Sequence, residues 1–183
     1  ALRTAGALPD RVAAVAGFHG GRLATDDPHS PHLAAPRITA EVYLGHADED
    51  PSLPPEQIER LEKALTDAGV GRVVYHSVAS PYVPAMPHHL GKAVSEDLVR
   101  RSGLAWTILQ PGAYLQNIDL TGPIDLPYSP DAPFGFLDLA DLGRAAAAVL
   151  TGTDHGGATY ELATRSATVR ELAVEAGVEV RQV

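Results

Sequence analysis

Two side chains with useful chemistry lie four residues apart in the segment "HHLGKAVSEDLVRRSG". They are His88 and Lys92, and a spacing of i and i+4 places both on one face of a helix. An imidazole titrates near neutrality, so His88 is suited to exchange protons, while Lys92 supplies a cation beside it. This pair is therefore the first candidate site in the chain.

A second candidate site follows the apolar run "AWTILQ". A turn at Pro111 and Gly112 brings the backbone close to a ligand, and Tyr114, Gln116 and Asn117 come directly afterwards. If the run is a parallel strand, these residues lie at its carboxyl end, where open α/β sheets hold their ligands. We therefore interpret Tyr114 and Asn117 as residues of a substrate pocket. The alternative is a structural turn with an exposed tyrosine.

Two other patterns are weaker. Gly17, Gly20 and Gly21 follow an apolar run, but a phosphate loop requires a helix directly after its glycines, and the prolines that follow exclude a long one. His29 and His32 lie in a proline-rich loop that offers no fixed geometry for a cation. We therefore predict neither a dinucleotide fingerprint at these glycines nor a metal site.

Apolar patterns predict strands and helices in alternation. We expect strands at residues 11–18, 38–45, 72–78, 105–110 and 158–163. We expect helices at residues 54–69, 88–103, 139–152 and 168–177, with an irregular connection from 113 through 136. Gly69 ends the first of these helices. The alternation favours a three-layer αβα fold with a mostly parallel sheet, in a single domain over residues 1–183.

The composition excludes several classes of protein. The 183 residues are 45% hydrophobic and 20% charged, which is a globular balance with enough chain for a core. A net charge of −9 gives no basic surface for nucleic acid or anionic lipid. The chain has no Cys, which fits a reducing cytoplasm, and no apolar run approaches the roughly 20 residues that span a bilayer. We expect a cytoplasmic protein with a small-molecule ligand, and the sequence leaves its oligomeric state open.

Residues 1–70 resemble the dienelactone hydrolase branch of the α/β-hydrolases, through the words "RVAAVAGFHGGRLATDDPHSPHLAAP" and "VYLGHADEDPSLPPEQIERLEKAL". In that family a strand ends in G-x-x-D, whose Asp orients the catalytic His. The resemblance places this pattern on Gly45 and Asp48, with Asp50 as a rival. The family's G-x-[SC]-x-G nucleophile elbow does not occur before these residues. Asp48 is thus expected as one member of an incomplete triad, or as a turn or cap residue.

Residues 71–183 resemble the NmrA-like group of atypical short-chain dehydrogenases, which bind NAD(P) on a Rossmann fold. The matching words are "GRVVYHSVAS", "PHHLGKAVSEDLVRRSGLAWTILQPGAYLQNI", "FGFLDLADLGRAAAAVLTG" and "GATYELATRSATVRELA". In ordinary short-chain dehydrogenases the motif Y-x-x-x-K supplies a proton-donating Tyr and a Lys that holds the nicotinamide ribose. The resemblance puts His88 at the Tyr position and Lys92 at the Lys position.

The same resemblance implies further contacts with a cofactor. The position of the catalytic serine falls on Val78, with Ser77 and Ser80 on either side, so the proton relay is weakened. Ser77, Pro111 and Gly112 are the other residues that we expect beside NAD(P). The glycine-rich loop that cradles the diphosphate belongs before the matched region and is not found there. We therefore expect an incomplete cofactor site.

Both families contain a helix that ends in A-G-V before a core strand. We therefore interpret the chain as a chimera joined at residues 69–70, by gene rearrangement or by design, and the rival interpretation is one divergent family. The two leading strands are expected in the same sheet as residues 72–77, where they cover a bare edge. The predicted function is that of an NmrA-like NAD(P)-associated protein, either a weak oxidoreductase or a redox sensor. The alternatives are a dienelactone hydrolase-type enzyme and a non-catalytic α/β scaffold.

Overall fold

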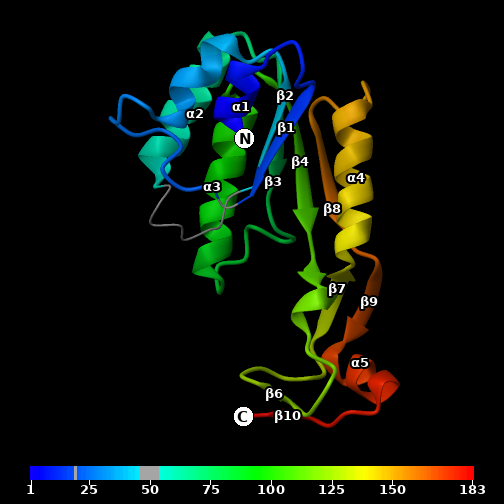
Figure 1. The fold of residues 1–183 in the computed structure, drawn as a ribbon. Helices are drawn as coiled ribbons and strands as arrows, with labels where there is room; N and C mark the ends of the chain where they lie inside the picture. Colours follow the sequence, from blue (N-terminus) through cyan, green and yellow to red (C-terminus); the bar gives the residue numbers. More distant parts are fainter. Residues whose placement is uncertain (19, 46–53) are drawn as a thin grey trace. The chain divides into compact units, whose positions relative to one another are not determined.

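A computed structural model describes residues 1–18, 20–45 and 54–183 of the chain (Figure 1). Its helices are α1 (Leu2–Ala7), α2 (Pro55–Asp67), α3 (Pro87–Arg101), α4 (Leu139–Thr151), α5 (Val169–Ala176) and the 3₁₀-helices η1 (Pro31–Arg37) and η2 (Leu115–Asn117). Its strands are β1 (Ala14–Phe18), β2 (Glu41–Gly45), β3 (Arg72–His76), β4 (Ala105–Pro111), β5 (Ala113–Tyr114), β6 (Ile124–Leu126), β7 (Pro133–Leu137), β8 (Ala158–Leu162), β9 (Arg165–Thr168) and β10 (Val180–Gln182).

The chain divides into two compact units. The first comprises residues 1–110 and 148–160, and the second comprises residues 111–147 and 161–183. Helix α4 and strand β8 each run from one unit into the other. Each unit has a buried hydrophobic cluster of its own. The single domain expected for residues 1–183 stays a prediction.

The first unit is built on a sheet in the order β1-β2-β3-β4-β8, in which β1 to β4 run parallel. The predicted join lies in the middle of this sheet, because β2 pairs with β3 in a register that runs from Val42↔Val73 to Gly45↔His76. Helix α2 provides the crossover that two parallel neighbours require. The predicted α/β class with a mostly parallel, Rossmann-like sheet is confirmed, and the two leading strands do share a sheet with residues 72–76.

Helix α2 ends where its sequence predicts. Leu61 and Leu65 lie one turn apart and are buried in the core of the first unit. After the last turn Gly69 adopts a φ of 78°, and the amides of Gly69 and Val70 donate to the carbonyls of Thr66 and Leu65 at 2.9 and 3.0 Å. These two bonds form a Schellman motif, which satisfies carbonyls that a helix end would otherwise leave without partners.

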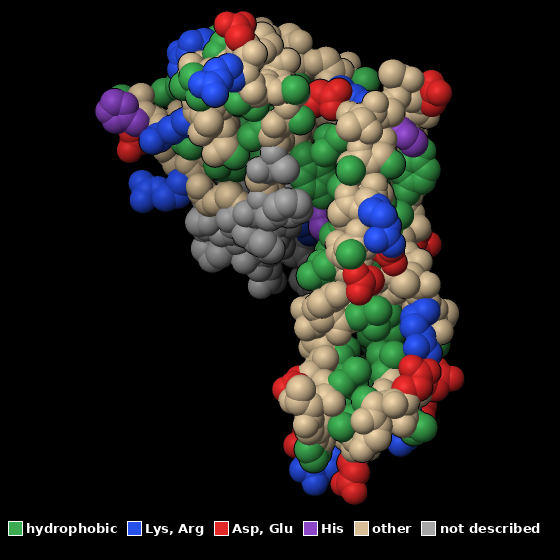
Figure 2. Space-filling model, turned by 45° about the vertical axis from the view of Figure 1, so that its right-hand side comes forward, with side chains coloured by type: hydrophobic (Ala, Val, Ile, Leu, Met, Phe, Trp, Pro, Cys, Tyr) green, Lys and Arg blue, Asp and Glu red, His purple; other side chains and the backbone are tan. Residues whose placement is uncertain are grey.

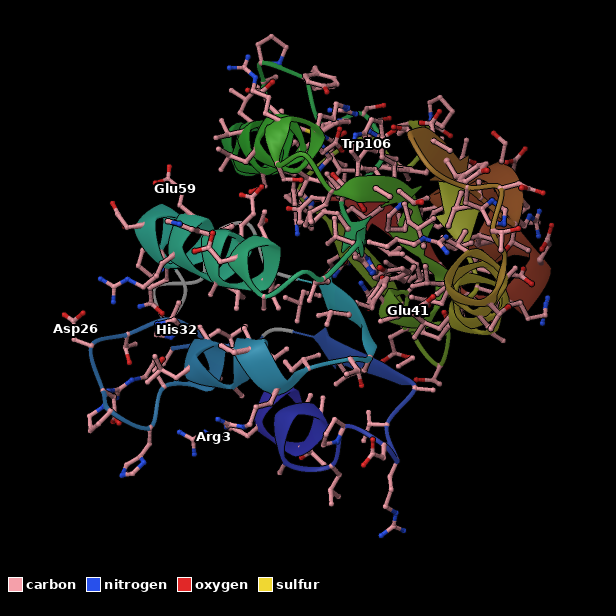
Figure 3. All side chains as sticks on the ribbon, turned by 90° about the horizontal axis from the view of Figure 1, so that it is seen from above. Arg3, Asp26, His32, Glu41, Glu59 and Trp106 are labelled. Atoms are coloured by element: carbon pink, nitrogen blue, oxygen red, sulfur yellow. The ribbon has the colours of Figure 1, made fainter. Side chains whose placement is uncertain are left out.

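The buried cluster of the first unit packs the helices of residues 1–70 against strand β2. Val42 and Leu44 of β2 belong to one cluster with side chains of α1, η1 and α2, namely Leu2, Ala5, Ala35, Leu61 and Leu65. Figure 3 shows these helices and α3 in a row along one side of the sheet. Burial of a large aliphatic side chain contributes about 1.5–3 kcal/mol. The cluster, whose members all lie within residues 1–70, therefore stabilises the packing of these helices against β2.

The second unit contains two small sheets, in the orders β5-β7-β9 and β10-β6. Strand β7 runs antiparallel to β9, and Phe136 of β7 packs in one buried cluster with Leu172 of α5. Helix α5 begins at a capping box, in which the Thr168 hydroxyl accepts from the Glu171 amide and the Glu171 carboxylate accepts from the Thr168 amide. Gly177 ends α5 with a φ of 70°. The sequence predicted this helix and its start correctly.

The expected irregular connection from residue 113 through 136 is wrong. It contains β5, η2, β6 and most of β7. These strands are short and rich in proline, and β7 pairs with residues about 30 positions later, as in Phe134↔Ala167. Such pairing leaves no local periodicity to detect, because the partner strand is not a sequence neighbour. Strands β9 and β10 and helix α1 were also not predicted, because their sequences show no clear local signal.

Charged side chains of opposite sign lie next to one another on the surface of the second unit, as Figure 2 shows on one face. The pairs that join distant parts of this unit are Arg165–Glu175, Arg170–Asp131 and Arg181–Asp125, at 2.8, 2.5 and 2.6 Å. Exposed pairs of this kind stabilise a fold little, because water screens them.

No helix in the described ranges is both long and apolar enough to cross a bilayer. The same ranges contain no group of three or more His, Asp or Glu side chains that could hold a metal ion. Among them, the first helix after β1 is the 3₁₀-helix η1, so Gly17, Gly20 and Gly21 do not open an α-helix.

Candidate functional site

Lys92 is a buried cation at the carboxyl end of β3. Its side chain is 6% exposed, and its ammonium Nζ donates to the carbonyl oxygen of His76 at 3.4 Å. The same ammonium lies 5.6 Å from the centre of the Tyr75 ring, within range of a cation–π interaction. Helix α3 carries Lys92 against β3, so the residue is fixed by two rigid elements.

The predicted partner of Lys92 shares its helix. His88 lies one turn earlier in α3, so the i and i+4 relation holds for the backbone, whereas its side chain lies outside the described residues. The neighbouring His89 has its Nδ1 3.2 Å from the carbonyl oxygen of Ser80. Ser80 is exposed and has a φ of 54°, a conformation that few residues other than glycine adopt.

Ser77 uses both its hydroxyl proton and its amide proton in hydrogen bonds within the protein. Its side chain is 3% exposed, its hydroxyl donates to the Glu96 carboxylate, and its amide donates to the carbonyl of Leu109 at 2.7 Å. A serine hydroxyl has one proton. Any further partner of Ser77 Oγ must therefore be a hydrogen-bond donor. Val78, which stands at the family's serine position, is half-buried and carries no such group.

A carboxylate that the sequence analysis missed lies at the centre of this region. Glu96 is fully buried, and its carboxylate accepts hydrogen bonds from Ser77, Tyr82, Arg100 and Gln110. The signal in the sequence was its spacing: Glu96 lies four residues after Lys92 and four before Arg100, on the same helix face. The sequence analysis considered only His88 and Lys92 on this helix, and the fold buries both Lys92 and Glu96.

A polar pair joins the two resembling segments. The hydroxyl of Tyr43, in the hydrolase-like segment, lies 2.5 Å from Nδ1 of His76, in the Rossmann-like segment. The rings meet edge to face with centroids 6.1 Å apart. Tyr43 is buried and stands at the carboxyl half of β2. Neither residue is among the candidate site residues of the sequence analysis, so the pair was not predicted.

Pro111 and Gly112 are the first residues of the second unit, and the structure gives each a structural role. Pro111 is buried, and the Gly112 amide donates to the carbonyl of Leu162 at 2.9 Å. A Cβ atom on Gly112 would lie 2.0 Å from the carbonyl oxygen of Gly135 in β7. Glycine is required at position 112 because two backbones approach each other there. Contact of these residues with NAD(P) stays a prediction.

The predicted pocket residues lie at β5 and η2. Tyr114 is half-buried, and burial raises the pKa of its hydroxyl, which therefore stays protonated at neutral pH. Gln116 ties this turn to the start of α4: its Nε2 donates to the Asp138 carboxylate at 2.9 Å, and its Oε1 accepts from the Leu139 amide at 3.3 Å. Asn117 is exposed. The role of Tyr114 and Asn117 in substrate binding stays a prediction.

Asp48 and its rival Asp50 lie outside the described residues. Their expected place in a hydrolase triad is therefore untested by the geometry. Residues 1–79 nevertheless match the model of the dienelactone hydrolase family. The match continues past the predicted join at residues 69–70 and through β3.

Reductases are similar to a longer part of the chain. The (4-alkanoyl-5-oxo-2,5-dihydrofuran-3-yl)methyl phosphate reductase of Streptomyces griseus subsp. griseus is 31% identical over 170 residues, which cover 87% of this chain and 56% of that protein. The NAD(P)H azoreductase of Xenophilus azovorans is 28% identical over 120 residues, which cover 59% of this chain and 41% of that protein. The chain thus spans about half the length of the curated relatives that it matches.

Solved structures show the same fold. The triphenylmethane reductase of Citrobacter sp., complexed with NADP(H), has a TM-score of 0.66 at 24% identity and covers 90% of this chain and 61% of its own. The structure of NmrA, a negative transcriptional regulator in complex with NADP, has a TM-score of 0.67 at 19% identity. The match covers 83% of this chain and 54% of the NmrA chain.

These coverages bear on the predicted join. Residues 71–183 make up only about three fifths of the chain, so alignments over 83% to 90% of it include part of residues 1–70. The hydrolase match and the reductase alignments therefore overlap, and the chimera stays a hypothesis beside that of one divergent family. Residues 1–79 resemble the dienelactone hydrolase family, and 83% to 90% of the chain shares the Rossmann-like fold of NmrA and the triphenylmethane reductase.

Proposed function

We propose that this chain acts as an NmrA-like, NAD(P)-associated oxidoreductase of low activity, or as a redox sensor, in which Lys92 binds the nicotinamide ribose. Two reductases are its curated relatives, and two structures that share its fold were solved with NADP or NADP(H). A small-molecule ligand is therefore the expected partner. The fold by itself does not specify a reaction, so the proposal depends on the site.

The observation that carries the proposal is the position of Lys92. An ammonium group loses hydration when it is buried, and this cost is tolerated only where fixed oxygen atoms or aromatic faces offset it. Lys92 has the His76 carbonyl and the Tyr75 ring in these roles, at the carboxyl end of a parallel strand. Ligands of open α/β sheets bind at this edge. Two hydroxyls of a ribose would give the ammonium further acceptors there.

The described residues fit one end of the cofactor better than the other. Lys92 suits the nicotinamide ribose, and Ser77 Oγ has only acceptor capacity left for a donor of the ligand. The diphosphate needs amide donors at a glycine turn that opens a helix. None of the α-helices in residues 1–18, 20–45 and 54–183 begins directly after a glycine. We therefore expect weak binding dominated by the nicotinamide end.

NAD(P)H, when bound, supplies a hydride. The residues of this chain would orient the cofactor and deliver a proton to the acceptor. Lys92 holds its ammonium in one place because α3 and β3 fix it at both ends. His88, at the position of the family's tyrosine, is the proposed proton donor, since an imidazolium releases a proton near neutral pH. Without a serine hydroxyl at position 78, we expect proton transfer to be slow.

Titration of the chain with NADPH tests the proposal. The sequence has only two lysines, so Lys92→Met has a matched control in Lys63→Met. Lys63 is 75% exposed and pairs with Asp67 on the surface of α2. A ligand at 100 times its Kd stabilises the folded state by about 2.7 kcal/mol, which a thermal shift detects. We expect a shift in the unmodified chain and in Lys63→Met, and none in Lys92→Met. The absence of any shift at millimolar NADPH would overturn the proposal.

A hydrolase is the second candidate, favoured by the family match over residues 1–79. Asp48 would then orient a histidine, as its position in the G-x-x-D pattern suggests. Turnover of a nitrophenyl ester or a lactone, abolished in Asp48→Asn, would support it. We expect no turnover, since the sequence before Asp48 has no nucleophile elbow. A chain that neither binds NADPH nor turns over an ester would be a non-catalytic scaffold.

A further inference from the structure

The end of β3 is bound to α3 at two successive points. The His76 carbonyl accepts from Lys92, and the next residue, Ser77, donates its hydroxyl to Glu96. Lys92 and Glu96 lie one helical turn apart on the same face of α3. The distance between the strand end and the helix is thus set by two hydrogen bonds, of which Lys92 makes one and Glu96 makes the other.

The Glu96 carboxylate has a complete set of partners. Ser77 Oγ and Gln110 Nε2 donate to its Oε1, the latter at 2.8 Å. The Tyr82 hydroxyl and an Arg100 nitrogen donate to its Oε2 at 3.2 and 2.8 Å. Two donors on each oxygen satisfy the acceptor capacity of this carboxylate, which would be costly to bury without partners.

The four donors come from different parts of the region around Lys92. Ser77 follows β3, Gln110 is near the end of β4, Tyr82 lies in the connection from β3 to α3, and Arg100 is in the last turn of α3. Arg100 also donates to the Tyr82 hydroxyl at 3.0 Å and stacks over Trp106, which Figure 3 labels, with 5.5 Å to the ring centre. One buried carboxylate therefore holds two strand ends and the connection that leads to His88.

We propose that Glu96 is a positioning residue for the cofactor site: it holds residues 77–86 and the carboxyl ends of β3 and β4 so that Lys92 meets the nicotinamide ribose. This inference deepens the proposed function and rests on it. Glu96 itself is fully buried, so we assign it no direct contact with the cofactor. Its effect passes through Ser77 and Tyr82, whose positions depend on where its oxygens lie.

The substitution Glu96→Gln tests the inference, because glutamine has nearly the same size and shape as glutamate but no carboxylate. An amide keeps one acceptor oxygen but turns an NH₂ group toward two of the four donors, so those partners must turn to accept or lose their hydrogen bonds, and Arg100 no longer faces a carboxylate. The control is Asp97→Asn, which removes the next carboxylate of α3; Asp97 pairs with Arg101 on the surface at 3.0 Å. Two quantities are measured below the melting temperature of every variant: the Kd for NADPH, and hydrogen exchange of the amides in residues 77–86 without cofactor.

We expect Glu96→Gln to weaken NADPH binding about tenfold, as the loss of a residue that orients a ligand-binding group commonly does, and to speed exchange in residues 77–86. Asp97→Asn should change neither quantity. Tyr82→Phe removes one donor and keeps the Glu96 carboxylate, so we expect a smaller loss of NADPH affinity. This variant serves as the test if Glu96→Gln does not fold.

Three results separate the failures. Unchanged NADPH affinity in a folded Glu96→Gln, with only a lower melting temperature, would mean that Glu96 is structural and would overturn the inference alone. If Glu96→Gln does not fold, unchanged affinity in Tyr82→Phe would overturn it in the same way. No NADPH binding by the unmodified chain would overturn the proposed function, and the inference about the cofactor with it, whatever hydrogen exchange shows.

Discussion

The end of helix α2 allows a test of the backbone conformation in the turn between the two segments. Gly69 and Gly71 lie two residues apart, on either side of Val70, between α2 and β3. Gly69 has a φ of 78°, whereas Gly71 lies outside the left-handed region. A Cβ atom added at either position would meet nothing within 4 Å. Alanine at the two sites therefore differs in backbone strain and in nothing else.

The magnitudes follow from this geometry. Replacing glycine by alanine reduces the conformational entropy of the unfolded chain, which stabilises the fold by about 0.4–1 kcal/mol where the backbone allows it. An L-residue held in the left-handed conformation costs about 1–2 kcal/mol. Gly71→Ala has only the stabilising loss of unfolded-state entropy. Gly69→Ala has the same gain and, in addition, the cost of holding alanine in the left-handed conformation. The free energies of unfolding of the two variants should thus differ by about 1–2 kcal/mol, with Gly69→Ala the less stable.

Urea denaturation followed by circular dichroism measures this difference. With a slope of about 2 kcal/mol per molar urea, the two midpoints should lie about 0.5–1 M apart at equal slopes. Gly103, at a φ of 79° after α3 and equally open, should respond to alanine as Gly69 does. Equal midpoints for Gly69→Ala and Gly71→Ala would refute the reasoning, since the Schellman motif would then not require a left-handed residue.

Three further predictions concern other parts of the chain. Thr168→Ala removes the capping box of α5 and should lower the free energy of unfolding by about 1 kcal/mol; hydrogen exchange of the α5 amides should speed up, and unchanged exchange would contradict it. Gly112→Ala would put a Cβ 2.0 Å from the Gly135 carbonyl oxygen, so we expect a loss of about 3 kcal/mol or more and rapid proteolysis in residues 111–147. Burial raises the pKa of Glu62, so its charged form destabilises the fold as pH rises through that pKa. Glu62→Gln should therefore be more stable than the unmodified chain at pH 7–8, by less than about 1 kcal/mol because water screens the group, and the gain should vanish below the unfolded pKa of 4.5. A gain that does not depend on pH would contradict this last prediction.

The sequence predicted the elements that carry their own signals. Helix α2 has a proline in its first turn, an apolar stripe and Gly69, and helix α5 has Thr168 and Glu171 at its start. Strands β1 to β4 have apolar runs of the kind that a parallel, two-sided sheet requires. The short strands of the second unit have no such signals, because their stability comes from partners far along the chain, as in Phe134↔Ala167.

The candidate site was predicted in part for a related reason. Spacing on a helix gave the common face of His88 and Lys92, since it is a local property. The burial of Glu96 is not local: it requires Gln110 of β4 and Tyr82 of the preceding connection to converge on one carboxylate. A row of alternating charges on a helix reads as a solvated surface. Only the packing of α3 against β3 and β4 distinguishes the two cases.

The join between the segments shows why a fold tolerates a combination that a catalytic site does not. Pairing of β2 with β3 uses backbone groups and small apolar contacts, so any parallel strand with Val42 and Leu44 on the covered side would satisfy it. Catalysis instead needs several side chains from distant positions within about 0.5 Å of one geometry. Each resembling segment brings some members of its own set, Asp48 in one and Lys92 with His88 in the other. If the chain is a chimera, both segments can contribute strands to one stable sheet, while the proposed chemistry would depend on Lys92 and on the Glu96 hydrogen bonds around it.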